Sequence, residues 1–205
     1  MSLKNLIGVA YRVKPFQITG GSSWVESDPY DIEAKPDNAA KAGAWQTMLQ
    51  ALLTDRFQLK FHRETKELPI YALMPARKDG KLGPNLTLSK EGSCADRNLP
   101  SVSQSSGPFC GGGSGRGRIS GLGMPIGGVA DVLSRMLDRS VIDKTVLTGK
   151  FDFQLQFTPA DRQAPDSQNP SLFTALQEQL GLKLESQKGP VEIFVIDGAQ
   201  KPTEN

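Results

Sequence analysis

The chain has 205 residues, which is enough to bury a substantial core in one domain or in two small ones. Its 38% hydrophobic and 22% charged content is ordinary for a globular protein, and a net charge of +2 argues against nucleic-acid binding, since no basic run accompanies interleaved aromatic residues. No apolar run approaches the roughly 20 residues needed to cross a bilayer, so we expect no transmembrane segment in this chain.

A first helix is predicted over residues 3–11, because its apolar residues recur at the i, i+3, i+4 and i+7 spacing that forms one buried face. Ser2 precedes it as a suitable N-cap. Tyr11 and Arg12 interrupt the apolar run, so the segment is interpreted as a helix of the fold and not as a signal peptide. A short strand is predicted at residues 16–18.

Two tryptophans stand in the next part of the chain. Trp24 lies between a glycine pair and an Asp-Pro sequence and is interpreted as a plug that covers the core, with a role as an exposed ligand platform as the alternative. An alternating strand is predicted over residues 30–34. Apolar residues at helical spacing then predict a helix over residues 45–53, which begins at Trp45.

Two strands, at residues 57–61 and 69–73, are predicted on either side of a charged hairpin turn at residues 64–67. His62, the one histidine of the chain, points away from the apolar face of the first strand. Acid–base catalysis or metal binding would require further partners, and the nearby glutamates supply only part of a set. We therefore expect no catalytic residue, no metal site and no cofactor.

Residues 77–117 are rich in glycine, serine and proline and show little periodicity, which predicts a linker. Both cysteines, Cys94 and Cys110, lie within it. A disulfide between them would close a loop of about fifteen residues, contribute about 3 kcal/mol in the chain-entropy model, and indicate an oxidising compartment outside the cytoplasm. The alternatives are two inert thiols or half of a zinc site, although one distant histidine does not complete a set of four zinc ligands.

The glycine run at residues 111–123 invites comparison with a phosphate-binding loop. It contains G-x-G pairs, but neither pair completes G-x-G-x-x-G after a strand, and no G-K-[ST] follows. The run is therefore interpreted as a flexible lead into a short strand at residues 118–120. Arg116 and Arg118 are candidate contacts for an anionic partner.

The second half of the chain is well marked by helix and strand signals. A helix is predicted over residues 126–133, with Pro125 in its first turn, and an alternating strand over residues 151–157. A last helix, over residues 172–180, is expected to follow an Asn169-Pro170 cap and to end at Gly181 in a left-handed turn. Strands are predicted at residues 182–184 and 190–194.

Both halves show the same order of helix, alternating strand, helix and two strands, with accidental similarity as the alternative explanation. We therefore predict an α+β fold of two tandem similar units, each a small mixed sheet with two packed helices. The expected organisation is a first repeat at residues 1–76, the linker at 77–117, a second repeat at 118–198 and a tail at 199–205. The second repeat has a leading strand that the first lacks, so we expect such a strand to be missing before Met1.

Several motifs of the sequence occur together in one known group of proteins. They are RETKELP at 63–69, LTGKFDF at 147–153, SLFTALQEQLGLKLES at 171–186, KGPVE at 188–192 and VID at 195–197. In these motifs the chain resembles a large paralogous family of uncharacterised acidobacterial proteins, and the resemblance covers nearly the whole chain. Members usually begin with an export signal and an additional strand, both absent here, so the resemblance implies export without an established activity. Each repeat also distantly resembles the short N-terminal module of secretins and TonB-dependent receptors.

Three functional hypotheses follow. The first, which we prefer, is a noncatalytic extracytoplasmic interaction or sensing module with a protein partner in the cell envelope, because short edge strands can pair with a partner strand. The second is a small-ligand-binding protein that uses the groove between the repeats, with Trp24, Trp45, Arg116 and Arg118 as candidate contacts. The third is a hydrolase, although one histidine, two loop cysteines and scattered carboxylates do not assemble a nucleophile, a base and an orienting group.

Overall fold

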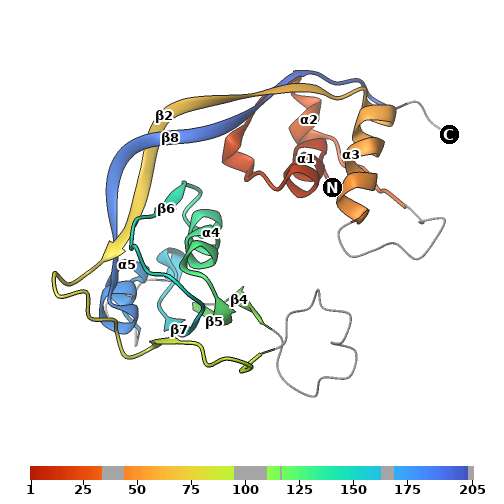
Figure 1. Cartoon of the computed structure of the whole chain (residues 1–205). Helices are drawn as coiled ribbons and strands as arrows, with labels where there is room; N and C mark the ends of the chain where they lie inside the picture. Colours follow the sequence, from red (N-terminus) through yellow and green to blue (C-terminus); the bar gives the residue numbers. More distant parts are fainter. Residues whose placement is uncertain (34–43, 95–109, 116, 163–168, 203–205) are drawn as a thin grey trace. The chain divides into compact units, whose positions relative to one another are not determined.

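The computed structural model of the protein describes residues 1–33, 44–94, 110–115, 117–162 and 169–202 (Figure 1). These residues form a mixed α+β fold with two four-stranded sheets, which confirms the predicted fold class. They divide into two compact units: unit 1 comprises residues 1–68 and 188–205, and unit 2 comprises residues 69–187. The structure does not confirm the tandem repeat, which stays a prediction.

Unit 1 is built around the predicted N-terminal helix. Its shorter elements are α1 (Leu3–Tyr11), η1 (Pro15–Gln17), β1 (Ile18–Gly20), α2 (Trp24–Ser27) and α3 (Ala44–Phe57). The Ser2 hydroxyl accepts a hydrogen bond from the Asn5 amide at 3.3 Å, which confirms Ser2 as the N-cap of α1. The Gln50 side chain of α3 donates to the Ala10 carbonyl at 2.8 Å, so the two helices are joined by a hydrogen bond as well as by apolar packing.

Three aromatic rings lie together in unit 1. Phe61 and Phe194 are stacked with their centroids 4.0 Å apart, and the Tyr11 ring lies 4.8 Å from Phe61 and 5.0 Å from Phe194. Burial raises the pKa of the Tyr11 phenol, because desolvation disfavours the charged phenolate. The cluster therefore favours the neutral form of Tyr11.

Two long strands, β2 (Lys60–Pro75) and β8 (Leu182–Gly198), each contribute residues to both units. The predicted hairpin turn at residues 64–67 is wrong, because β2 runs through it without interruption, and β8 likewise joins the two strands predicted after Gly181. Arg63, Lys66 and Glu67 are exposed, and Arg63 pairs with Glu192 of β8 at 2.7 Å. Charged residues are expected in a solvent-exposed turn, and equally in a strand that has both faces in water, so charge alone does not distinguish the two. This stretch also lacks the glycine, proline or asparagine that a tight turn favours.

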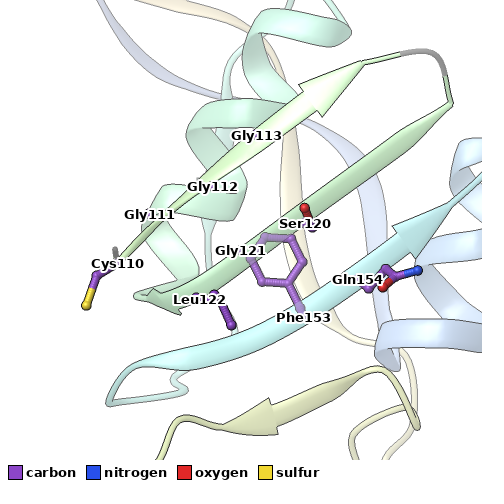
Figure 2. A pocket seen from close by; sticks show the side chains of 9 residues that line it. All are labelled: Cys110, Gly111, Gly112, Gly113, Ser120, Gly121, Leu122, Phe153 and Gln154. Atoms are coloured by element: carbon purple, nitrogen blue, oxygen red, sulfur yellow. The ribbon is translucent and has the colours of Figure 1, made fainter. Parts of the chain in front are cut away.

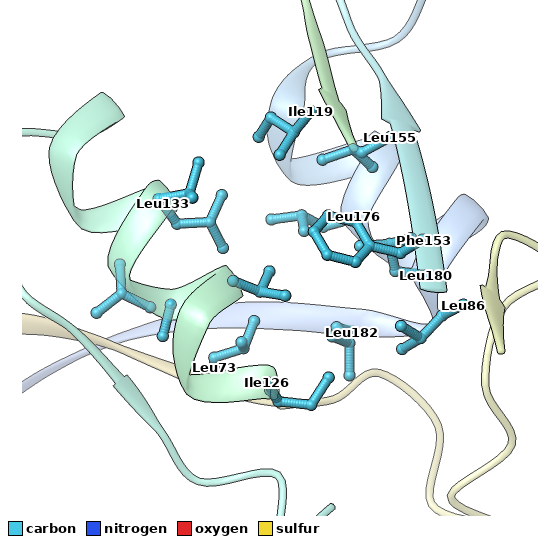
Figure 3. Close-up of a cluster of buried hydrophobic side chains, with 14 of the residues drawn as sticks. Leu73, Leu86, Ile119, Ile126, Leu133, Phe153, Leu155, Leu176, Leu180 and Leu182 are labelled. Atoms are coloured by element: carbon cyan, nitrogen blue, oxygen red, sulfur yellow. The ribbon is translucent and has the colours of Figure 1, made fainter. Parts of the chain in front are cut away.

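Unit 2 contains the second sheet and the remaining helices. Its elements are β3 (Leu86–Leu88), β4 (Gly111–Gly115), β5 (Arg118–Met124), α4 (Ile126–Met136), β6 (Val141–Asp143), β7 (Phe151–Gln156), η3 (Ala160–Arg162), α5 (Leu172–Ala175) and the π-helical η4 (Leu176–Leu180). Its core packs α4 and η4 against β5 and β7, as Figure 3 shows for Leu133, Leu176 and Leu155. Gly181 ends η4 with a φ of 69°, which confirms the predicted left-handed turn.

The two sheets have the strand orders β1-β8-β2-β6 and β3-β7-β5-β4. In the first, β1 pairs with β8 and β6 with β2, both in parallel. In the second, the β3–β7, β5–β7 and β4–β5 pairs are antiparallel. Strands β3 and β4 lie in residues 77–117, so the segment predicted to be a linker supplies both edges of the second sheet.

Three further predictions need correction. Residues 30–33 are not a strand, because the Tyr30 amide bonds the Met1 carbonyl at 2.8 Å and its ring packs on Phe57; Ala34 lies outside the described residues. The strand expected at residues 16–18 begins only at Ile18, after the turn of η1. The cap of the last helix is Ser171 and not the Asn169-Pro170 pair, since the Ser171 hydroxyl accepts from the Thr174 amide at 3.2 Å.

A buried serine joins α4 to β6 in unit 2. The Ser134 hydroxyl is fully buried, donates to the Ala130 carbonyl and accepts from the Val141 amide, each at 2.8 Å. Replacing it leaves the Val141 amide buried without an acceptor, so we expect Ser134→Ala to lower the free energy of unfolding by about 1–3 kcal/mol. Urea denaturation measures this, with the exposed Ser114→Ala as the control; a loss below about 0.5 kcal/mol would contradict the assignment.

Tyr11 makes the stability of unit 1 depend on alkaline pH. Because its folded pKa is raised above the unfolded value of about 10, its contribution to stability is present below pH 10 and is lost as the pH rises through the folded pKa. We expect the melting temperature of the Tyr11→Phe variant to fall less than that of the wild type as the pH rises from about 9 to about 11. Melting temperatures across this range test it, and parallel declines in the two proteins would show that Tyr11 does not contribute.

Candidate functional site

Unit 2 exposes a strand that is almost all glycine: β4, Gly-Gly-Gly-Ser-Gly at residues 111–115. It lies at the edge of the sheet order β3-β7-β5-β4 and pairs with β5 on one side. All of its residues are exposed. A strand at the edge of a sheet presents unpaired backbone N–H and C=O groups, which another strand can use.

The register between β4 and β5 decides which glycines face outward. Gly113 lies opposite Ser120 and Gly115 lies opposite Arg118. Directly opposed residues share a face of the sheet. The outward face therefore carries Ser120 and Arg118, whereas the buried Ile119 marks the face that packs on the core.

The glycines of this sheet differ in the space around them. A Cβ added at Gly112 would clash with Met124, and one added at Gly121 would clash with the ring of Phe153. At Gly113 and Gly115, no heavy atom of a described residue lies within 4 Å of such a Cβ. Packing within the chain thus requires glycine at the first two positions and leaves open space at the last two.

A surface pocket of about 470 Å³ lies along β4 and β5. Figure 2 shows Gly111–Gly113 on β4, Ser120, Gly121 and Leu122 on β5, and Gln154 on β7. Its side chains are mixed in character, since Leu122 is apolar and 37% exposed while Ser120 and Gln154 are polar. The pocket can accept a side chain that has an apolar body and a polar end.

A disulfide fixes the beginning of β4. Cys94 and Cys110 are bonded, which confirms the predicted pair, and Cys110 directly precedes Gly111. Both sulfur atoms lie against Gly123 near the end of β5, where a Cβ would clash with the Cys94 sulfur. The Gly123 amide also donates to the Asp152 carboxylate at 2.8 Å. The disulfide therefore holds the first residue of β4 beside β5.

The two tryptophans that the sequence suggested as ligand contacts both belong to unit 1, and both are distant from β4 in the sequence. Trp24 is the first residue of α2, contacts the Tyr30 ring at 6.4 Å and has the Lys201 amine 5.8 Å from its own ring. Lys201 in turn pairs with Asp28 at 2.6 Å, and this hydrogen bond lowers the pKa of that carboxyl. Trp45 lies on α3 and is 52% exposed.

The two predicted arginines follow β4 in the sequence. Arg118 is exposed on β5 opposite Gly115, so it belongs to the candidate site. Arg116 lies outside the described residues. The site as a whole was missed by sequence reasoning, which interpreted this glycine run as a flexible lead into a strand.

His62 has a partner that sequence reasoning also missed. Its Nδ1 lies 2.8 Å from an Asp197 carboxylate oxygen, and the two side chains are 53% and 47% exposed. The partner comes from β8, 135 residues away in the chain, so no local pattern could reveal it. Within the described residues, no group of three or more histidine, cysteine or acidic side chains is placed to hold a metal ion.

Comparisons with known proteins give a family and no activity. The described helices include none that is long and apolar enough to span a membrane. No curated protein and no solved structure matches the chain. Residues 4–199 match the model of a family described as "Protein of unknown function (DUF3738)". Since the match spans nearly the whole sequence, the chain belongs to this DUF3738 family of proteins of unknown function.

Proposed function

We propose that the chain is a noncatalytic protein-interaction module that acts outside the cytoplasm and binds an extended segment of a partner protein by strand addition to β4. The observation that carries the proposal is the open edge, since β4 ends its sheet and all of its residues are exposed. In strand addition, main-chain hydrogen bonds supply affinity and spaces for alternate side chains supply specificity. β4 offers backbone groups at the sheet edge for the hydrogen bonds, and open space at Gly113 and Gly115 for the side chains.

The other sheet edges formed by the described residues suit this role less well. Strands β1, β3 and β6 have 3 residues each, whereas β4 has 5. Natural edges are protected by short length, charged side chains or proline. β4 has neither charge nor proline, so a second strand can approach its backbone along the whole length.

The sheet itself indicates which partner side chains fit. Gly121 of β5 lies directly opposite Phe153 of β7, and the Phe153 ring fills the space that the glycine leaves. An aromatic ring across from a glycine shields the exposed backbone of that strand. Gly113 and Gly115 leave the same kind of space on the outward face, so a partner with aromatic residues at alternate positions would cover them.

Two neighbours favour tyrosine or tryptophan at these positions. Ser120 lies opposite Gly113 and can hydrogen-bond the polar end of such a ring. Arg118 lies opposite Gly115 with its side chain exposed, and a guanidinium near an aromatic face adds a cation–π attraction. The partner segment is thus expected to be extended and to alternate aromatic with small or β-branched residues.

Two observations support the noncatalytic and extracytoplasmic parts of the proposal. His62 forms an exposed pair with Asp197, and pairs of this kind are common on protein surfaces without a catalytic role. The Cys94–Cys110 disulfide is a bond that persists in oxidising compartments. The resemblance of the sequence to exported proteins agrees with the same location.

A matched pair of valine substitutions on β4 tests strand addition. The probe is a synthetic peptide that alternates tyrosine with threonine. Gly113→Val fills the space on the outward face, so we expect it to raise the Kd for this peptide about tenfold or more, since overpacking costs about 1–3 kcal/mol. Calorimetric titration measures the Kd, and melting temperatures should not fall, because valine favours strands more than glycine does.

Ser114→Val is the control, because it adds a side chain of the same kind to the same strand on the opposite face. It should keep the Kd within about twofold of the wild type. A peptide that alternates leucine with threonine should bind about threefold to tenfold more weakly than the tyrosine peptide. The proposal fails if no peptide binds, if both variants weaken binding equally, or if the peptide binds the apolar pocket beside Met136 and Phe173.

A further inference from the structure

We propose that the Cys94–Cys110 disulfide controls the β4 edge, so that its reduction releases β4 from β5 and withdraws the binding strand. The inference concerns the regulation of the site proposed above and rests on that function for its biological meaning. The structural claim is separate, because the release of β4 can be measured without any partner. Its basis is the way in which β4 is attached to unit 2.

The core of unit 2 does not include β4. Its buried residues come from the helices and from strands such as β5 and β7, and none of those described comes from residues 110–115. All five β4 residues are exposed, and four of them are glycine. Glycine loses more conformational freedom on folding than any other residue, so the ordering of this strand is unfavourable by itself.

Two kinds of interaction therefore hold β4 in place. One is the set of backbone hydrogen bonds to β5, over a register that runs from Gly111 opposite Leu122 to Gly115 opposite Arg118. The other is the disulfide, which ties the residue before Gly111 to Cys94 and rests on Gly123. Without the disulfide, the described residues of this exposed glycine strand are held mainly by backbone hydrogen bonds that water can replace.

The bond is placed where a reductant can reach it. Both Cys94 and Cys110 are partly exposed. A dithiol reductant attacks one sulfur as its thiolate, which forms a mixed disulfide and releases the other cysteine as a thiolate that takes up a proton. The second thiol of the reductant then displaces the first cysteine. Two electrons have passed to the protein, which holds two thiols, and the reductant leaves as its own disulfide.

The test is hydrogen exchange of the whole chain without a partner, with and without a dithiol. We expect reduction to speed the exchange of those β4 amides that are hydrogen-bonded to β5 by at least tenfold and up to roughly a hundredfold, as the loss of a closed loop of this length predicts. Amides of α4 should change little, because the helix belongs to the core. Titration of free thiols confirms that two have appeared.

The double variant Cys94→Ser and Cys110→Ser separates the bond from other effects of the reductant. It should show fast amide exchange in β4 with or without dithiol. The rest of unit 2 should still be folded and show a thermal unfolding transition. Equal exchange of β4 in the oxidised and reduced proteins would overturn the proposal, as would an equal acceleration in α4, which would make the disulfide a general staple of unit 2. Failure of the oxidised protein to bind any extended peptide would instead refute the proposed function and leave this result intact.

Discussion

The antiparallel register between β4 and β5 is the constraint on which the account of this protein depends. It turns Gly113 and Gly115 outward and Gly112 inward toward Met124. A shift of one residue would exchange these faces and place the open positions against the core. The disulfide at Cys110 helps to fix this register, because it sets the position of the residue where β4 begins.

In unit 2, the residues that keep it folded are separate from those proposed to bind. Its stability comes from helices packed on β5 and β7, and from buried bonds such as that of Ser134 to the Val141 amide. β4 is added at the edge of this scaffold and contributes exposed backbone. Because the core does not use β4, the proposed release of this strand, or its pairing with a partner, would leave the rest of unit 2 folded.

Local patterns in the sequence predicted the elements whose signal is local. Helical periodicity found α1 and α4, the hydroxyl of Ser2 and the conformational freedom of Gly181 marked helix ends, and the spacing of the two cysteines indicated their bond. Each of these features depends on neighbours in the chain. That is why residues alone could reveal them.

Features set by pairing between distant segments could not be predicted. β2 and β8 looked like pairs of short strands, because their exposed charges resemble those of a turn and their partners lie far away. The Asp197 partner of His62 follows from the same distant pairing. β4 gave no strand signal, since glycine has no side chain to alternate and a low intrinsic preference for strands. Only the register with β5 shows it to be an edge.

The central claim, that a partner strand pairs with β4, is tested most directly by nuclear Overhauser measurements on the complex with the tyrosine–threonine peptide. The account predicts short cross-strand contacts between backbone protons of the peptide and those of Gly111–Gly115, with tyrosine ring protons close to Gly113. Contacts that leave β4 untouched and run along another edge or pocket would contradict it.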